Sequence, residues 1–405
     1  MWSPHDARRV VCTPDGVGVR VTVVAETFQP AVNGVVNSVI RVADQLAARG
    51  HEPVVVAPSG APFRTPSGYL IDVIRVPSVP LPSYRGLSVA RPSTALTPVL
   101  RELDPDVVHL ASPALLGSAA VRAASELGIA SVAVFQTDLS GFLRRYHLGA
   151  AQPALWSWLR ELHNRADLTL VPSSASAYQL RRHGIGPLEL WTRGVDSHQF
   201  NPAHRDERLR AHLAGPGSGR LLVGFVGRLA AEKRVELLEP LSRTPGVQLV
   251  IVGDGPKRAA LRRLMPGAIF TGQLLGAELG RLMASLDVLV HPGDAETFCQ
   301  VVQEALCSGV PVVTVAAGGP LDLVRHGENG WLWAGDDPRL LAAQIVELGH
   351  DRTRLAQVAE RARPSVVWRS WGRVTDQLIG HYGRAMALRG VARPAPTRRL
   401  ERRAS

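Results

Sequence analysis

The feature that most constrains the fold is the alternation of short, uninterrupted apolar runs with helix-compatible segments, in two successive series. The first series comprises residues 19–25, 54–57, 107–110, 130–135 and 168–171, and the second comprises 221–226, 247–252, 268–270, 286–291 and 310–315. Runs that are apolar throughout are typical of parallel strands buried on both faces. Strands that alternate with helices predict βαβ units. The sequence therefore predicts an α/β protein with two Rossmann-like, doubly wound parallel-sheet domains.

The composition of one central segment indicates where the two domains meet. Residues 201–220 are rich in proline and glycine and show no apolar periodicity, as is typical of a linker. We expect a disordered extension at 1–18, a first domain at 19–200, the linker at 201–220, a second domain at 221–367, a helical segment at 368–388 that packs back on the first domain, and a basic tail at 389–405. Ligands of such a pair bind in a central cleft at the carboxyl ends of the strands.

Cysteine usage and apolar content indicate the compartment. The three cysteines, Cys12, Cys299 and Cys307, form no C-x-x-C pair, which favours a reducing compartment and argues against a cysteine-based zinc site. No apolar run reaches the ~18 residues that span a bilayer, and the N-terminal segment lacks the apolar core of a secretion signal. We therefore expect a cytoplasmic protein.

The positive charge is concentrated at the C-terminal end. The formal net charge is +11, and residues 381–405 contain seven arginines against one glutamate, a net +6. Such a tail could be a solvated segment, could attach to an anionic membrane surface at ~1 kcal/mol per basic residue, or could bind nucleic acid. No aromatic residues are interleaved with these arginines, so we expect no nucleic-acid partner. Peripheral attachment to the inner face of the cell membrane is kept as the functional alternative to a solvated tail.

The segment 296–305 (ETFCQVVQEA) is the most informative motif. Thr297 and Gln300 have the spacing of a capping box, which predicts a helix that begins at Phe298 and ends near residue 308. The backbone N–H groups of Phe298, Cys299 and Gln300 would then point into the cleft and form a pyrophosphate site. Glu296 lies in the preceding loop, and Glu304 is expected two turns inside the helix among apolar residues.

Two cations are predicted on the same side of the cleft. The apolar run 221–226 is followed by Arg228 and Lys233, which would both lie at the carboxyl end of a strand and neutralise a diphosphate. The turn after a later strand places Leu274 at the same rim. These positions predict a nucleotide site in the second domain.

The first domain contributes a different set of residues. Gly34 follows the first strand and precedes a helix, but the G-x-G-x-x-G fingerprint of dinucleotide-binding domains is absent. A glycine here would let the backbone approach a diphosphate from the opposite side. Asn33, Gln136, Asp138 and Arg193 are predicted contacts to a sugar or to an acceptor.

These motifs together resemble those of family 4 glycosyltransferases over residues 19–385, especially actinobacterial GDP-mannose-dependent α-mannosyltransferases that act on glycolipid or phosphatidylinositol acceptors. The resemblance implies the GT-B fold, in which the two domains face a central cleft. It implies that Glu296 contacts the donor sugar, Glu304 holds the ribose hydroxyls, Arg228 and Lys233 bind the diphosphate, and Gly34 approaches it. Glu296, Arg228 and Lys233 are thus the predicted catalytic residues. Leu274, Phe298, Cys299 and Gln300 complete the predicted donor site.

The resemblance also implies the chemistry. It implies transfer of a hexose with retention of configuration, without a metal or other cofactor, from a nucleotide sugar to a lipid-linked acceptor. The sequence departs from the family pattern at Cys299, where many relatives have glycine, and at Gln136, where many have histidine. The alternatives are a transferase that uses a UDP-sugar and a soluble acceptor, a nucleotide-sugar epimerase, and a nucleic-acid-binding protein.

Overall fold

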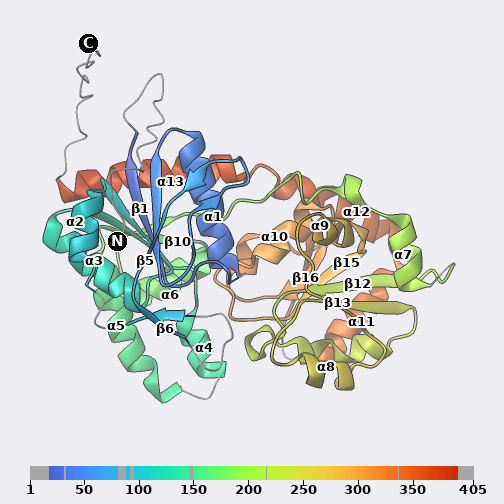
Figure 1. Ribbon diagram of the computed structural model, residues 1–405. Coiled ribbons are helices and arrows are strands. Elements are labelled where there is room, and N and C mark those ends of the chain that lie inside the picture. Colours follow the sequence, from blue (N-terminus) through green and yellow to red (C-terminus); the bar gives the residue numbers. More distant parts are fainter. Residues whose placement is uncertain are drawn as a thin grey trace, which may run out of the picture.

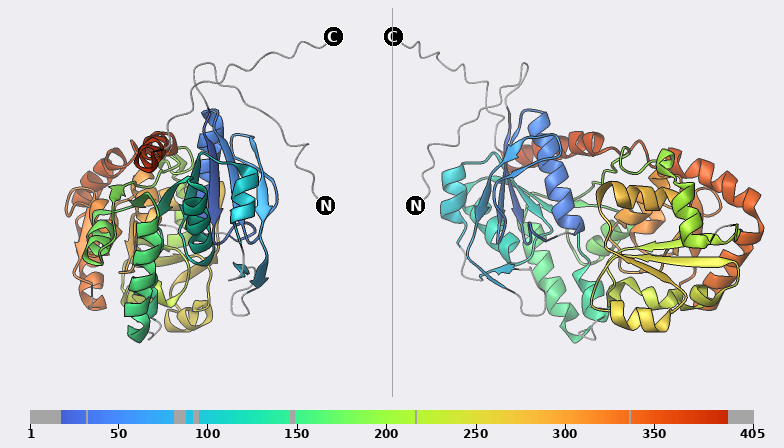
Figure 2. Two further views of the ribbon diagram at one scale, coloured as in Figure 1. Left: turned by 90° about the vertical axis from the view of Figure 1, so that its left-hand side faces the viewer. Right: turned by 45° about the vertical axis from the view of Figure 1, so that its right-hand side comes forward.

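The computed structural model describes residues 18–31, 33–80, 88–91, 95–145, 149–215, 217–335 and 337–390. Two parallel sheets form two domains that lie side by side, and the last helix returns to the first domain (Figure 1, Figure 2). Most of the extension expected at 1–18 and of the tail expected at 389–405 lies outside the described residues.

The first domain is built on a seven-stranded parallel sheet with the order β11-β10-β9-β8-β1-β2-β5. Its strands are β1 (Arg20–Ala25), β2 (Glu52–Ala57), β5 (Val73–Arg75), β8 (Val107–Ala111), β9 (Ala130–Val134), β10 (Leu168–Val171) and β11 (Leu188–Leu190). Neighbouring residues of β1 pack on opposite faces, since Val23 belongs to one buried cluster and Val24 to another. This explains why the run is apolar throughout.

Helices cover both faces of this sheet. They are α1 (Gly34–Ala48), α2 (Thr97–Leu103), α3 (Leu115–Leu127), α4 (Leu139–Arg145), α5 (Gln152–Arg165) and α6 (Ser174–Arg182). Two small antiparallel pairs, β3 (Phe63–Arg64) with β4 (Leu70–Ile71) and β6 (Ser78–Pro80) with β7 (Ser88–Ala90), and the short helix η2 (Gly149–Ala151) complete the domain.

The second domain is built on a six-stranded parallel sheet with the order β14-β13-β12-β15-β16-β17. Its strands are β12 (Leu221–Val226), β13 (Val247–Val252), β14 (Ile269–Gly272), β15 (Val288–His291), β16 (Val312–Val315) and β17 (Gly330–Trp333). Its helices are η4 (Ala231–Lys233), η5 (Val235–Arg243), α8 (Arg258–Leu264), α9 (Gly276–Ser285), α10 (Gln300–Cys307), η6 (Gly319–Asp322), α11 (Pro338–His350), α12 (Arg352–Ala362) and η7 (Arg363–Ser365). One face packs on α9 and α10, and the other packs on η5, α8, α11 and α12.

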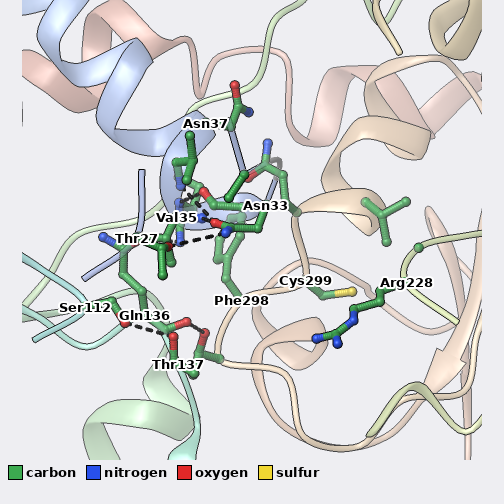
Figure 3. Close-up of a pocket in the computed structure, with 18 of the residues that line it drawn as sticks. Thr27, Asn33, Val35, Asn37, Ser112, Gln136, Thr137, Arg228, Phe298 and Cys299 are labelled. Atoms are coloured by element: carbon green, nitrogen blue, oxygen red, sulfur yellow. Dashed lines mark hydrogen bonds between the residues drawn. The ribbon is translucent and has the colours of Figure 1, made fainter. Parts of the chain in front are cut away.

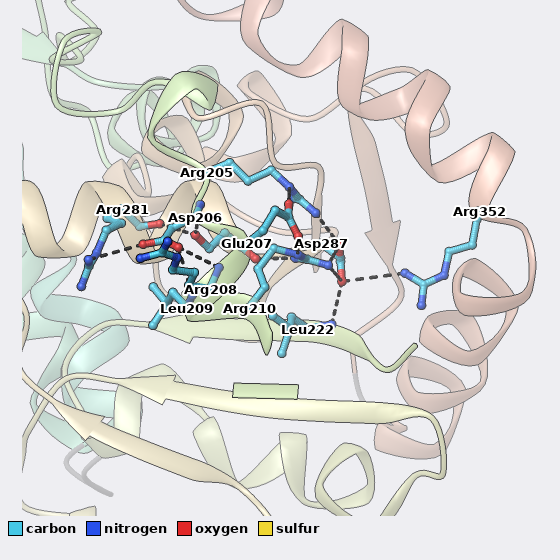
Figure 4. Close-up of polar contacts among 11 residues, drawn as sticks. Arg205, Asp206, Glu207, Arg208, Leu209, Arg210, Leu222, Arg281, Asp287 and Arg352 are labelled. Atoms are coloured by element: carbon cyan, nitrogen blue, oxygen red, sulfur yellow. Dashed lines mark hydrogen bonds and ion pairs between the residues drawn. The ribbon is translucent and has the colours of Figure 1, made fainter. Parts of the chain in front are cut away.

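The segment predicted to be a linker, 201–220, has regular structure of its own. It contains η3 (Pro202–His204) and α7 (Glu207–Ala214). Asp287, which precedes β15, accepts a hydrogen bond from the backbone N–H of Leu222 and forms an ion pair at 2.9 Å with Arg210 of α7 (Figure 4). Arg205 and Arg352 each lie 3.7 Å from the same carboxylate. Asp287 therefore fixes the linker segment against the second domain.

The helix α13 (Trp371–Arg389) lies against the first domain. The Trp191 indole donates a hydrogen bond to the carbonyl of Val374 (2.8 Å), and the buried Tyr382 hydroxyl bonds His109 Nδ1 (2.8 Å). Burial lowers the pKa of His109 to about 3, so this histidine is neutral and structural. No helix among the described residues is long and apolar enough to span a membrane.

Several contacts join the two domains across the cleft. The Thr297 hydroxyl donates to the carbonyl of Gln136 (2.9 Å), and the carbonyl of Thr297 accepts from Ser176 (3.3 Å). The Asp322 carboxylate accepts from the backbone N–H of Ser174 (2.6 Å) at the start of α6. The structure therefore describes an arrangement in which the domains touch near the loop 294–299.

Candidate active site

A cleft of about 1700 Å³ runs between the two domains. Every residue that the sequence predicted for the site lines it: Asn33, Gly34, Gln136, Asp138, Arg193, Arg228, Lys233, Leu274, Glu296, Phe298, Cys299, Gln300 and Glu304. Figure 3 shows that the two domains supply opposite walls, with Asn33 and Gln136 on one and Cys299 and Arg228 on the other.

The predicted start of the helix after Glu296 is wrong. The helix α10 begins at Gln300 rather than at Phe298, and Cys299 is its N-cap, with a left-handed backbone (φ 74°, ψ 71°) and no side-chain capping bond. The capping box does not form because both partners bond elsewhere: Thr297 donates to the carbonyl of Gln136, and the Gln300 amide donates to the carbonyl of Gly194. Glu304 therefore lies one turn inside the helix, and the leading N–H groups belong to Gln300 and Val301.

Glu296 is held as a carboxylate by two neighbours. Its Oε1 bonds the Lys233 ammonium and lies 3.0 Å from His291 Nε2 at the end of β15. Burial raises the pKa of Glu296, but the charge of Lys233 and the bond from His291 outweigh it and hold the pKa at about 2. His291 was not predicted from sequence, although its place as the last residue of a strand before the motif was a usable signal.

Glu304 has the opposite environment. It faces the cleft from α10, and no cation pairs with it among the described residues. Burial raises its pKa to about 8, with a smaller opposing effect from the bond to Gln300. The two glutamates therefore differ in protonation at neutral pH.

The cations lie beyond the carboxyl end of β12. Arg228 follows that strand; its side chain is 40% exposed, and its guanidinium lies 3.9 Å from the Glu232 carboxylate. Lys233 ends η4 and reaches Glu296. Leu274 follows β14 and lines the same wall. A positive wall with a helix N-terminus beside it suits a bound diphosphate.

The first-domain wall is formed by the start of α1. Asn33 caps this helix, because its side-chain oxygen accepts from the N–H groups of Val35 and Val36 at 3.0 Å. A Cβ added at Gly34 would meet no atom within 4 Å, so the backbone faces open space in the cleft. This position can accept a ligand atom in close contact with the main chain.

The other predicted first-domain residues are tied to the protein. Asp138 accepts from the N–H of Gly141 (2.9 Å) in the first turn of α4. Arg193 donates to the carbonyl of Gly34 and to the side-chain oxygen of Gln136. The sequence missed the bonds of Arg193 because they join segments that are far apart in the chain.

Three neighbouring side chains, one of them Cys299, have the chemistry of metal ligands. The ligand atoms of His291, Glu296 and Cys299 lie within 4.8 Å of one another. The Lys233 ammonium, however, already bonds the Glu296 oxygen of this group. The described geometry thus directs that carboxylate to a lysine.

Two family models match the chain. The model described as Glycosyltransferase Family 4 matches residues 32–199, and the model described as Glycosyl transferases group 1 matches residues 220–351. The two matches fall on the two sheets.

Relatives match nearly the whole chain. It is 48% identical over 377 residues to a GDP-mannose-dependent alpha-mannosyltransferase of Mycolicibacterium smegmatis, a match that covers 92% of this chain and 99% of the relative. It is 45% identical over 372 residues to a protein of the same name from Corynebacterium glutamicum (91% and 90% covered). The solved structure of Anabaena HepE in complex with UDP and glucose has the same fold, with a TM-score of 0.72 and 21% identity over 90% of this chain and 99% of that one. The predicted GT-B fold is confirmed.

Proposed function

Since this chain belongs to glycosyltransferase family 4, we propose that it transfers mannose from GDP-mannose to a lipid-linked acceptor, with retention of the anomeric configuration. The observation that carries the proposal is that cationic groups and two glutamates in different environments lie together in the cleft. One wall offers Arg228, Lys233 and the start of α10 to a diphosphate, and two glutamates of different protonation flank them. The named activity of the two relatives supplies the donor.

The two glutamates hold different parts of the donor in this proposal. Glu296 is a carboxylate, so it accepts hydrogen bonds from hydroxyl groups of the hexose and does not act as a general acid. Glu304 lies one turn after the start of α10 and binds the ribose hydroxyls. Neither is assigned as a covalent nucleophile.

The leaving diphosphate takes part in the chemistry. The bond between the anomeric carbon and the β-phosphate oxygen breaks as the acceptor oxygen attacks the same face of the sugar. The acceptor proton passes to that phosphate oxygen. Arg228, Lys233 and the N–H groups of Gln300 and Val301 stabilise the negative charge that develops on the leaving group. These groups perform what a divalent cation would do, so we propose that transfer requires no metal.

The acceptor side of the cleft belongs to the first domain. Ala31, Ala61 and Pro62 supply apolar surface near the start of α1, and Asp138 and Thr137 supply polar groups. This mixed lining suits a sugar or polyol head group joined to an apolar chain. The arginines at the C-terminal end support a peripheral position at an anionic membrane surface.

The test is a thermal-shift panel of GDP, UDP, ADP and their sugars, followed by product analysis. A ligand that binds only the folded state raises the melting temperature by mass action. We expect GDP and GDP-mannose to stabilise the protein most, with or without EDTA, and the product to retain the α configuration. Stabilisation by UDP-sugars alone would overturn the mannosyl proposal in favour of a UDP-dependent transferase.

A further inference from the structure

Arg193 is the most deeply buried arginine in the described part of the chain, with 8% of its surface exposed. It lies between β11 and the crossing to the second domain, and it lines the cleft. No carboxylate of the described residues lies within ion-pair distance of its guanidinium. Its neighbour Arg41, by contrast, pairs with Asp196 at 2.8 Å.

Both side-chain partners of Arg193 are neutral oxygens. One guanidinium nitrogen donates to the carbonyl of Gly34 (3.1 Å), and the other donates to the side-chain oxygen of Gln136 (2.5 Å). Its own carbonyl accepts from the buried Gln303 amide of α10 (3.0 Å). Arg193 therefore connects the first turn of α1, the segment that follows β9, and α10, the second-domain helix that follows the loop 294–299.

A buried charge without a counter-charge is costly, and proteins normally pair it. Burial lowers the pKa of Arg193 to about 10, which still leaves it charged at neutral pH. The positive end of the α1 dipole lies at Gly34, on the same wall, and adds to this charge. The buried guanidinium of Arg193 and the start of α1 thus place positive charge behind Gly34 on the first-domain wall.

We propose that Arg193 is a positioning residue whose unpaired charge is balanced by the diphosphate of the bound donor. It stands behind Gly34, the position at which the main chain faces open space, and opposite Arg228 and Lys233. The diphosphate would lie between cations of both domains, so Arg193 would favour the donor-bound, closed arrangement. This inference rests on the proposed function in requiring a nucleoside diphosphate, but not in requiring guanine or mannose.

The test compares a charged and an uncharged ligand. Calorimetric affinities of GDP and guanosine are measured for the wild type, Arg193→Gln and Arg193→Lys. Arg193→Gln should weaken GDP by about tenfold or more, because a charge is lost from a site of low dielectric, and should leave guanosine within about twofold. Arg193→Lys, which keeps the charge but cannot make both hydrogen bonds, should stay within about threefold of the wild type for GDP.

Arg363 provides the matched control. Like that of Arg193, its guanidinium bonds only neutral acceptors, which here are the backbone carbonyls of Ser197, Phe200 and Cys307 and the Cys307 sulfur, and it does not line the cleft. Arg363→Gln should lower thermal stability without changing the ratio of GDP to guanosine affinity. Equal losses for GDP and guanosine in Arg193→Gln, or a tenfold loss of GDP affinity in Arg193→Lys, would overturn the proposal in favour of a purely structural role.

A failure of the proposed donor would remain distinguishable. If the wild type binds UDP and not GDP, the mannosyl proposal fails, and the same comparison is made with UDP and uridine. If Arg193→Gln does not fold, Arg193→Lys decides, because it must retain the preference for the diphosphate.

Discussion

Glu296 and Glu304 lie in one motif, but their neighbours give them different protonation states. Lys233 and His291 keep Glu296 ionised, whereas Glu304 forms no ion pair among the described residues, and burial raises its pKa against the smaller effects of Gln300 and the Arg41 charge. The motif alone would have suggested an acid and a base. Their surroundings instead favour two binding groups for one nucleotide sugar.

Glu296→Gln tests the sugar role. The glutamine amide has one accepting oxygen, whereas the carboxylate has two. We therefore expect mannosyl transfer to fall by about 10²–10³-fold, while GDP affinity stays within a few-fold. Steady-state kinetics and calorimetry measure the two quantities. Glu278→Gln, an exposed change on α9 outside the cleft, is the control. Activity of Glu296→Gln within a few-fold of the wild type would refute the role.

Glu304 should make nucleotide binding depend on pH. With a pKa of about 8, it is about nine-tenths protonated at pH 7. Ribose hydroxyls donate to the carboxylate and favour the charged form, so binding should release close to one proton at pH 7, and GDP affinity should rise by about tenfold between pH 7 and pH 9. Calorimetry in buffers of different ionisation enthalpy measures the proton count. In Glu304→Gln the proton released by Glu304 is lost, and only the proton release of GDP itself remains. Equal proton release by the variant and the wild type would contradict the assignment.

Gly34→Ala tests the open main-chain position. The added methyl group meets no protein atom within 4 Å, so stability should be unchanged or higher by about 0.4–1 kcal/mol. GDP affinity should fall by tenfold or more if the diphosphate approaches this backbone. Gly380→Ala in α13, where a Cβ also meets nothing, is the control and should alter only stability. Wild-type GDP affinity in Gly34→Ala would place the diphosphate elsewhere.

At the level of residues, the sequence predicted which side chains gather but not how they bond. All the predicted positions line one cleft because each follows the carboxyl end of a strand, and parallel strands end at a common edge. The start of α10 was mispredicted because Thr297 and Gln300 bond Gln136 and Gly194, more than 100 residues away. A local capping rule has no access to such partners.

Among the elements, α7 shows where composition misleads. The glycines and prolines around residues 215–220 indicate a linker, yet the segment before them is a helix capped by Asp206 and bound to Asp287. The short edge strands β5, β11 and β17 were also not predicted. The strands β5 (VIR) and β11 (LEL) each contain a charged residue among only three, and β17 (GWLW) contains no β-branched residue, so none of them shows the apolar run with β-branched residues that marks the predicted strands.

Asp287→Ala should destabilise the second domain. It removes the acceptor of the Leu222 N–H and leaves the Arg210 guanidinium, whose side chain is only 15% exposed, without this partner, a loss of about 3 kcal/mol in the free energy of unfolding. Urea unfolding followed by circular dichroism measures it. Glu328→Ala removes an exposed pair with Arg325 and should cost less than about 1 kcal/mol. Similar costs for the two variants would show that the Asp287 cluster adds little.

For the whole molecule, the two series of apolar runs sufficed to predict two parallel-sheet domains and the cleft between them. They could not predict the relative placement of the domains. That depends on single contacts such as the bond from Thr297 to the carbonyl of Gln136, which no periodicity encodes.

We propose that the arginines after residue 390 attach the protein to an anionic membrane surface. A chain ending at Gly390 loses five arginines and one glutamate. We expect at least tenfold weaker binding to phosphatidylserine vesicles at low salt, since each basic residue contributes ~1 kcal/mol near such a surface. A full-length variant with lysine at those five positions should bind like the wild type. Unchanged vesicle binding by the shortened chain would leave the arginines as a solvated tail.

The chain crosses between the domains twice, and the two crossings lie against each other. Val195 pairs with Ser370, and Gly194 packs so closely on Trp371 that a Cβ there would come within 2.6 Å of that residue. The two crossings therefore form one joined connection between the domains. The helix α10 is bonded to this connection, because Gln300 and Gln303 donate to the carbonyls of Gly194 and Arg193. The start of α10, which lines the cleft, is thus held directly by the segment that joins the two domains.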